Sequence, residues 1–173
     1  MPRYDLPNAA PEPLRLVQRF VNTVDFERDR DWLADMLAEE SVDAKPRELE
    51  RARQTREAIR ELLYANNRQP VQGHPHEVLR AAAARARFTL DLERPALAPE
   101  AAGLDGLLGR VLAIVYGAMV DGSWNRLKAC RNHGCRWAFY DHSRNRSASW
   151  CSMQLCGNRT KTRVYRRRHG ATA

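Results

Sequence analysis

The sequence predicts a mainly helical protein with a small β-hairpin or sheet. Three observations predict it: apolar residues recur at helical spacing through the first 120 residues, all four cysteines lie between 130 and 156, and the charge balance changes sign near residue 125. At 173 residues the chain is long enough for one domain with a hydrophobic core and one small module. We therefore expect a helical domain over 1–123 and a cysteine-containing module over 124–173.

Helical periodicity divides the N-terminal part into successive segments. We expect helices over about 14–25 and 30–40, a longer one that begins at Pro46 and ends near Asn66-Asn67, and an Ala-rich one from Pro75. The clearest helix has apolar residues at i, i+3, i+4, i+7, i+8, i+11 and i+15. These are Leu104, Leu107, Leu108, Val111, Leu112, Val115 and Met119. Gly122 suits the turn that ends this helix.

One segment changes to a period of two. Phe88, Leu90 and Leu92 alternate with polar residues, which is typical of a strand with one buried face. A strand needs a partner, and 96–98 is the nearest candidate. The predicted sheet is therefore small.

The net charge of +8 is unevenly distributed. From Arg126 onward there are 12 Lys and Arg residues against one acidic residue, a local charge of +11, so the preceding part carries −3. Such density attracts a polyanion, although a solubilising basic tail is the alternative.

We also expect a soluble cytoplasmic protein. No stretch approaches the roughly 20 unbroken apolar residues of a membrane span, and the start, Met1 to Asp5, lacks the apolar core of a secretory signal.

The four cysteines form two C-x4-C pairs separated by 15 residues, at Cys130, Cys135, Cys151 and Cys156. Paired thiolates on tight turns are a typical zinc site, and clustered thiols in a reducing compartment favour a metal over disulfides. A site filled by four thiolates has no open position, so one Zn2+ would be structural. The alternatives are buried free cysteines, an iron–sulfur cluster, or replacement of one cysteine by His133 or His142.

The sequence around the cysteines predicts a tight metal-binding turn (a zinc knuckle), followed by a hairpin and a helix. Trp137 and Phe139 alternate as in a short strand, and the chain from Leu155 onward has helical character. These aromatics, with Tyr140 and Trp150, could stack on unpaired bases, but a module of this size needs them as core.

Basic residues near the end of the chain are candidate nucleic-acid contacts. In a helix, Arg159, Arg163 and Arg166 would share one face, where they could reach phosphates. Some of this charge, at Arg131, Arg136 and Arg159, could instead offset the zinc–thiolate centre. The full set of predicted contacts is Arg144, Arg146, Arg159, Lys161, Arg163, Arg166, Arg167 and Arg168.

Two segments carry a family resemblance. The run Trp150-Cys151-Ser152-Met153, then Cys156-Gly157-Asn158-Arg159, preceded by 141–145, resembles the CGNR zinc finger. The run Leu16-Val17 to Val21-Asn22-Thr23-Val24-Asp25 resembles the start of the ABATE domain, which accompanies this finger in stress-induced bacterial transcription regulators. The resemblance implies a zinc-held DNA-binding finger on a regulatory domain, and in it Asn22 would either line a ligand pocket or cap a helix.

The leading hypothesis is a DNA-binding transcription regulator. Its zinc finger would hold a basic helix against duplex DNA, and its N-terminal domain would sense a small-molecule effector or form a homodimer. The alternative is an RNA-associated or ribosome-associated zinc protein. We do not expect an enzyme, because the first 125 residues contain no Gly-rich phosphate loop and no nucleophile motif.

Overall fold

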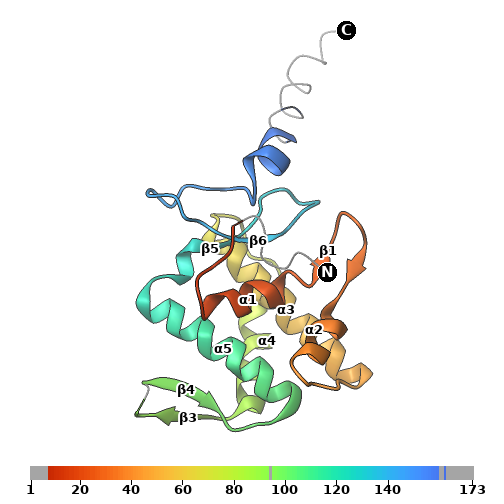
Figure 1. Ribbon diagram of the computed structural model, residues 1–173, viewed down its shortest axis with the longest axis vertical. Coiled ribbons are helices and arrows are strands. Elements are labelled where there is room, and N and C mark those ends of the chain that lie inside the picture. Colours follow the sequence, from red (N-terminus) through yellow and green to blue (C-terminus); the bar gives the residue numbers. More distant parts are fainter. Residues whose placement is uncertain (1–7, 94, 160–161, 163–173) are drawn as a thin grey trace.

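The computed structural model describes residues 8–93, 95–159 and 162, and its helices are joined by three small antiparallel hairpins (Figure 1). The helices are α1 (Leu14–Val21), α2 (Leu33–Glu39), α3 (Pro46–Asn66), α4 (Pro75–Ala86) and α5 (Gly103–Asp121). The strands are β1 (Val24–Asp25), β2 (Arg30–Asp31), β3 (Phe88–Asp91), β4 (Ala96–Pro99), β5 (Leu127–Ala129) and β6 (Ala138–Tyr140). They pair as β1–β2, β3–β4 and β5–β6. The predicted fold class, mainly α with small β-hairpins, is confirmed.

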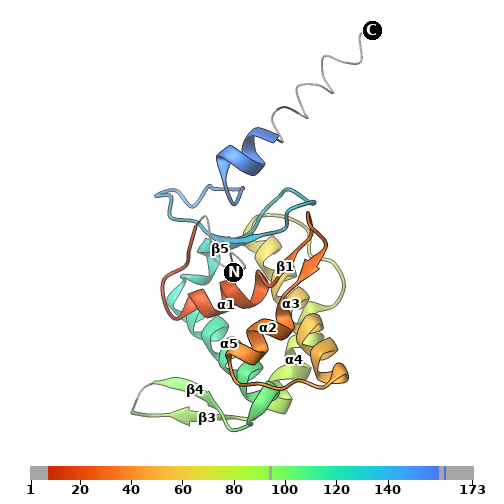
Figure 2. The ribbon, with the colours of Figure 1, turned by 45° about the vertical axis from the view of Figure 1, so that its right-hand side comes forward.

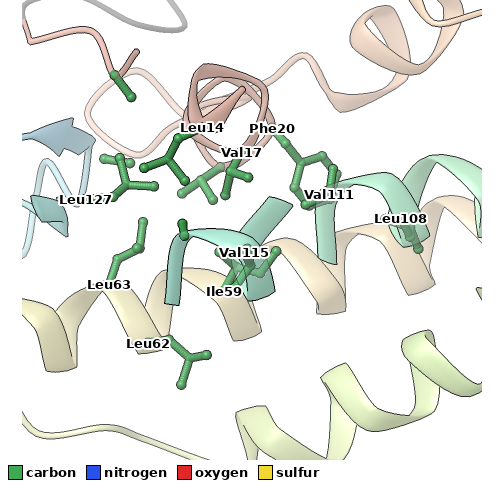
Figure 3. Packing of buried hydrophobic residues seen from close by; sticks show 14 of the residues in the cluster. Leu14, Val17, Phe20, Ile59, Leu62, Leu63, Leu108, Val111, Val115 and Leu127 are labelled. Carbon is green, nitrogen blue, oxygen red and sulfur yellow. The ribbon is translucent and has the colours of Figure 1, made fainter. Parts of the chain in front are cut away.

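Helix α5 lies at the centre of the core and packs against α1, α3, α4 and β4. Figure 3 shows Leu14, Val17 and Phe20 of α1 above Val111 and Val115 of α5 and Ile59 of α3. Gly109 lets the neighbours approach closely, since a Cβ there would lie 2.6 Å from the Pro99 Cβ and 2.8 Å from the Ala86 Cβ. The apolar periodicity of 104–119 therefore marks the central core helix.

Helices α3 and α5 are confirmed almost to the residue, α4 begins at Pro75 as predicted, and the first two helices are shorter than predicted. The first helix ends at Val21 rather than near Asp25, and the second begins at Leu33 rather than near Arg30. The reason is the β1–β2 hairpin, in which Val24 pairs with Asp31 and Asp25 with Arg30. The Asp25 carboxylate accepts hydrogen bonds from the backbone N–H groups of Glu27 and Arg28, which stabilises the turn.

Within the described residues, α5 is the one helix whose length and composition would allow it to cross a membrane. Its buried residues include Leu104, Leu108, Val111 and Val115, all of which belong to the main core cluster. Such packing is what a core helix of a folded domain requires.

The predicted pairing of β3 with β4 is confirmed, but the expected burial of its apolar face is wrong. Leu90 is 71% exposed and Leu92 is 84% exposed, and only Phe88 of the three is half-buried. The hairpin lies at the bottom of the molecule below α5 (Figures 1 and 2), and β4 is the strand that packs against that helix, so Leu90 and Leu92 stay uncovered. Met119 of α5 is likewise 46% exposed. In the last turns of this helix the residue that faces the core is Ala118, which is buried.

The hairpin of β5 and β6 joins the helical core directly. Leu127, Ala129, Ala138 and Tyr140 belong to the same buried cluster as the residues of α1, α3 and α5. A second, smaller cluster contains Phe139 and three of the cysteines. The hairpin is therefore packed on both faces, with the helices on one side and the cysteine cluster on the other.

Candidate zinc centre and its attachment to the helical domain

The four cysteines lie together at one end of the β5–β6 hairpin. Cys130 follows β5 directly, Cys135 lies in the turn before β6, and Cys151 and Cys156 approach from the C-terminal side. All four Sγ atoms lie within 4.8 Å of one another, with 3.7 Å between Cys135 and Cys151 and 3.6 Å between Cys151 and Cys156. A zinc ion with Zn–S bonds of about 2.3 Å has tetrahedral S···S edges of about 3.8 Å. The cluster therefore has the donor set and the spacing of a four-thiolate zinc site.

The protonation of the cluster also favours a cation. Hydrogen bonding from Cys135 and Cys151 lowers the pKa of Cys130 to about 3, whereas the contact with the Cys130 thiolate raises the pKa of Cys135. The pKa of Cys151 is raised for the same reason. Four thiolates this close repel one another strongly unless a divalent cation lies between them, and metal binding would release the shared protons.

Local backbone structure positions the second cysteine pair. The Ser152 hydroxyl accepts a hydrogen bond from Leu155 N at 3.3 Å and caps the short π-helical turn Met153–Gly157, and Cys156 N donates to Ser152 O at 2.9 Å. Gly157 lets the Met153 side chain lie against the backbone of this turn, since a Cβ would lie 2.7 Å from the Met153 Sδ and would displace that side chain. The segment from Leu155 onward is helical as predicted as far as the structure describes it: it begins as a π-helical turn, and Asn158 and Arg159 are α-helical.

Neither histidine alternative is part of the cluster. His133 is exposed in the turn between the first two cysteines. The His142 ring lies 2.8 Å through Nε2 from Ala9 O and packs edge-on against Tyr140. Among the residues that the structure describes, the cluster consists of the four cysteines alone.

Side-chain amides of the helical domain cover both edges of the β5–β6 hairpin. On the β5 edge, Asn66 Nδ2 donates to Leu127 O at 2.9 Å and Asn67 Nδ2 donates to Ala129 O at 2.7 Å. On the β6 edge, Asn22 exchanges two hydrogen bonds with Ala138, whose carbonyl also accepts from Gln18 Nε2 at 3.1 Å. These buried and half-buried amides satisfy backbone groups that a third and a fourth strand would otherwise bind.

The turn after the first cysteine pair is attached through arginines. Arg60 is fully buried and donates to Arg136 O at 2.8 Å and to Val21 O at 2.6 Å. The guanidinium of Arg136 lies over the Phe26 ring at 4.4 Å and near Glu61 at 3.6 Å. Burial raises the pKa of Glu57, but Arg60 and Arg56 outweigh it, so the net pKa is lowered and the carboxylate stays charged. The sequence predicts that Arg136 offsets the charge of the zinc–thiolate centre. In the structure its guanidinium lies near carboxylates of α3 instead.

A buried ion pair shapes the loop between the two cysteine pairs. Lys128 Nζ lies 2.7 Å from the Asp141 carboxylate and also donates to the carbonyls of Arg146 and Ala148. The same carboxylate accepts hydrogen bonds from Ser143 and from Ala148 N. Burial raises the pKa of Asp141, but the interactions with Lys128 and Ser143 lower it by more than burial raises it. The net pKa is therefore below the ordinary value of an aspartate. Charged groups this buried are stable only when fully hydrogen-bonded, as both are here.

The loop places two of the predicted nucleic-acid contacts on the surface. Arg144 and Arg146 are both exposed, and the described residues contain no ion pair with either side chain. Arg159 is different, because its Nη1 lies 2.8 Å from the Glu27 carboxylate on the β1–β2 hairpin. The other predicted contacts, Lys161, Arg163, Arg166, Arg167 and Arg168, lie outside the described residues.

Much of the remaining positive charge of this module is used within the protein. Arg126 donates to the carbonyls of Asp141 and Ser143, and Arg131 donates twice to Asn67 O. Together with Lys128 and Arg136, these residues fix the module to itself and to the helices. The +11 charge therefore overstates the number of cations that are available to a partner.

The sequence suggests two roles for Asn22, lining a ligand pocket or capping a helix. Asn22 is the C-cap residue of α1, and its fully buried side chain is hydrogen-bonded to Ala138. Two shallow cavities of about 350 and 380 Å3 lie elsewhere, beside the loop that holds Ser41 and Val42, and Asn22 lines neither of them. The pocket role stays a prediction, while the hydrogen bonds to β6 are what the structure describes.

The aromatic residues of the module are mostly core. Phe139 is fully buried and Tyr140 is 9% exposed, while Trp137 and Trp150 pack partly buried against the cysteine cluster. Stacking on bases would need their faces in solvent, so the structure favours a packing role.

Comparison with known families agrees with this architecture. Residues 14–121 match the ABATE family model, described as "Putative stress-induced transcription regulator", and residues 126–169 match the CGNR zinc finger model. No curated protein matches the chain. The two matches meet between α5 and β5, where the helices end and the cysteine module begins. The chain therefore belongs to the ABATE family of transcription regulators and carries a CGNR zinc finger at its C-terminal side.

Proposed function

We propose that this protein is a cytoplasmic regulator that binds duplex DNA through the zinc finger and the basic residues around it. The observation that carries the proposal is the loop of Arg144 and Arg146, whose two arginine side chains are exposed. The backbone of this loop is held by hydrogen bonds to the buried side chains of Lys128 and Asp141. A loop held in one conformation loses little entropy when its arginines contact phosphates.

The basic segment after Cys156 supplies further cations for the proposed contact. The chain between 157 and 168 adds six Lys or Arg residues with no acidic residue among them. Because phosphate contacts dominate affinity for nucleic acid, about six such contacts would give a log–log salt slope of roughly −5 on duplex DNA.

The zinc ion would have a structural role in this mechanism. Four thiolates fill a tetrahedral site, so no position remains for a water or substrate, and we do not expect catalysis. The metal would hold the β5–β6 turn, the loop and the C-terminal segment in one geometry. An enzymatic role would require a displaced cysteine and an exchangeable ligand.

RNA binding is the alternative function. It uses the same cations but would gain from aromatic stacking, and the burial of Phe139 and Tyr140 supports the duplex instead. Competition between a DNA duplex and a structured RNA of equal length tests the choice.

A role of the helical domain in effector binding is part of the proposal. The candidate site is the 380 Å3 cleft between the 40–42 loop and the start of α5, lined among others by Ser41, Val42, Leu107 and Arg110. A ligand there would contact α5, which also packs against α1, the helix followed by Asn22. Screening small molecules by thermal shift, with Leu107→Trp filling the cleft as the control, tests this part.

The decisive experiment is a binding titration on the zinc-loaded full chain. Fluorescence anisotropy with a duplex library should give affinity that falls steeply with salt, and recovery of bound sequences would identify the preferred site. Binding that does not depend on salt, or a clear preference for structured RNA, would overturn the DNA assignment.

A further inference from the structure

The four cysteines differ in their access to solvent. Cys130, Cys151 and Cys156 are buried, with exposed fractions of 0%, 3% and 2%. Cys135 is only half-buried, because it directly follows the exposed residues 133–134 of the turn between the first two cysteines. A small polar oxidant from solvent therefore reaches one sulfur of the cluster more easily than the other three.

A second sulfur lies close enough to react with the first. The Sγ atoms of Cys135 and Cys151 are 3.7 Å apart, so they need to approach by about 1.7 Å to reach the length of a disulfide bond. Cys151 lies outside the strands, whereas Cys130 is held at the end of the β5–β6 hairpin by its N–H, which donates to Trp137 O at 2.9 Å. The geometry therefore favours Cys151 over Cys130 as the reaction partner.

The fourth cysteine is less suited to this reaction. Cys156 Sγ accepts a hydrogen bond from Asn132 Nδ2 at 3.5 Å. A hydrogen bond of this kind stabilises the thiolate and makes it a weaker nucleophile. Cys156 is also buried, so it reaches neither the solvent nor an oxidant there as directly as Cys135 does.

We propose that Cys135 is an oxidation site, at which a hydroperoxide such as H2O2 converts Cys135 and Cys151 to a disulfide. The Cys135 thiolate attacks one peroxide oxygen, the O–O bond breaks, and a sulfenic acid and a hydroxide ion result. The Cys151 thiolate then attacks the Cys135 sulfur, forms the S–S bond and displaces the second hydroxide. The two sulfurs together lose two electrons, which reduce the peroxide.

The reaction removes two of the four metal ligands. Zinc binds thiolates, and the sulfurs of a disulfide carry no negative charge, so only Cys130 and Cys156 remain as ligands. We therefore expect the metal to leave the protein as the disulfide forms. The inference rests on the zinc centre and not on nucleic-acid binding, so each can fail without the other.

Loss of the metal at Cys135 should also reach the helical domain. The next residue, Arg136, has a positive φ of 56°, which is a strained conformation for a residue other than glycine and persists only where the surroundings hold it. The buried Arg60 of α3 donates to Arg136 O at 2.8 Å. Once Cys135 no longer anchors this turn, the backbone can relax and Arg60 loses a hydrogen-bond partner. Oxidation should therefore lower the melting temperature of the helices.

The first test is oxidation of the zinc-loaded full chain by H2O2 without added thiols. A colorimetric chelator should detect release of the zinc, and peptide mapping should place one disulfide between Cys135 and Cys151. With limiting peroxide, dimedone, which traps sulfenic acids, should label Cys135 first. A disulfide without Cys135, a disulfide of Cys135 with Cys130, or first labelling of another cysteine would overturn the proposal. Dithiothreitol with added zinc should restore the original melting curve.

Two histidine variants provide the second test. Cys135→His keeps a zinc ligand but cannot form a disulfide, so zinc release by peroxide should be at least tenfold slower than in the wild type. Cys156→His makes the same exchange at a buried ligand and leaves Cys135 and Cys151 intact, so its release should stay close to the wild-type rate. Zinc content measured before oxidation shows that both variants are loaded. Equal rates for the two variants would contradict the proposal, and the dimedone experiment on the wild type decides it if either variant fails to bind zinc.

Discussion

Asn22 and Ala138, which are 116 residues apart in sequence, exchange two hydrogen bonds in the core. Asn22 Nδ2 donates to Ala138 O at 2.8 Å, and Ala138 N donates to Asn22 Oδ1 at 2.7 Å. Both residues are fully buried. The end of α1 therefore acts as a pairing partner for the strand that follows the first cysteine pair, and links the helical domain to the finger.

Replacement of Asn22 should destabilise the whole protein. Asn22→Ala leaves the buried N–H of Ala138 without a partner, and an unsatisfied buried group costs about 1–3 kcal/mol in addition to the lost bonds. We expect the free energy of unfolding to fall by about 2–4 kcal/mol in urea denaturation. Asn145→Ala, at an exposed position in the finger loop, is the control and should change it by less than about 0.5 kcal/mol. If the two variants were equally stable, the link through Ala138 would have no energetic weight.

Removal of zinc should lower the stability of the helices as well as that of the finger. The β5–β6 hairpin shares its core with α1, α3 and α5, so loosening of the cysteine cluster exposes part of that core. A bound ion stabilises the folded state by RT ln(1 + [Zn]/Kd), which amounts to several kcal/mol for a tight site. We expect a chelator, or Cys151→Ser, to lower the melting temperature measured at 222 nm. A helical signal that melts at the same temperature with and without zinc would show that the two parts fold independently.

The Lys128–Asp141 pair offers a test of what shapes the finger loop. Lys128→Met leaves a buried carboxylate without its counter-charge and should cost about 3–5 kcal/mol. The double variant Lys128→Met with Asp141→Asn should recover part of this loss, because no unpaired charge remains. A double-mutant cycle measured by denaturation gives the coupling between the two residues. Additive effects would mean that the pair contributes nothing beyond its separate contacts.

The fold could be predicted from sequence where the apolar pattern was long and regular. The segments that became α3, α4 and α5 have strong periodicity and clear start or stop residues, and the cysteine spacing identified the metal cluster. The end of α1 and the start of α2 could not be predicted, because Val24–Asp25 and Arg30–Asp31 form a hairpin whose strands, with two residues each, are too short to show a period. The burial of Leu90 was predicted wrongly, because alternation shows which side chains share a face and not whether a helix covers that face.

The residues that attach the finger to the helices were missed for a different reason. Asn66, Asn67 and Arg60 resemble ordinary helix-end and surface residues in the sequence, and their partners lie about 60–80 positions away. Lys128 gave no signal beyond its charge. One clue was available: Asp141 is the single acidic residue among the last 48, and an isolated carboxylate in so basic a segment is a candidate for a structural partner.

The exposed arginines should affect binding and leave stability unchanged. Arg144→Gln with Arg146→Gln removes two proposed phosphate contacts, so the log–log salt slope on duplex DNA should become less steep by roughly 1.8. Arg131→Gln is the opposite case, because its guanidinium binds Asn67 O inside the protein and its loss should lower stability first. Anisotropy titrations at several salt concentrations, with denaturation curves on the same samples, separate the two effects. Equal slopes for the wild type and the double variant would remove this loop from the interface.

The ion pair between Arg159 and Glu27 predicts a gain of affinity on mutation. The Glu27 carboxylate lies 2.8 Å from Arg159 Nη1 and would both neutralise that guanidinium and repel a nearby phosphate. Glu27→Gln should therefore tighten duplex binding about 1.5- to 5-fold at low salt, the range expected for one exposed pair, and the gain should vanish as salt screens it. Asp29→Asn, which removes a charge from the same hairpin and keeps a side chain that tolerates its positive φ of 51°, controls for net charge alone. If both variants tighten binding equally, the effect is general electrostatics; if only Glu27→Gln does so, the β1–β2 hairpin restrains a DNA-binding arginine, and the helical domain has a direct means of modulating the finger.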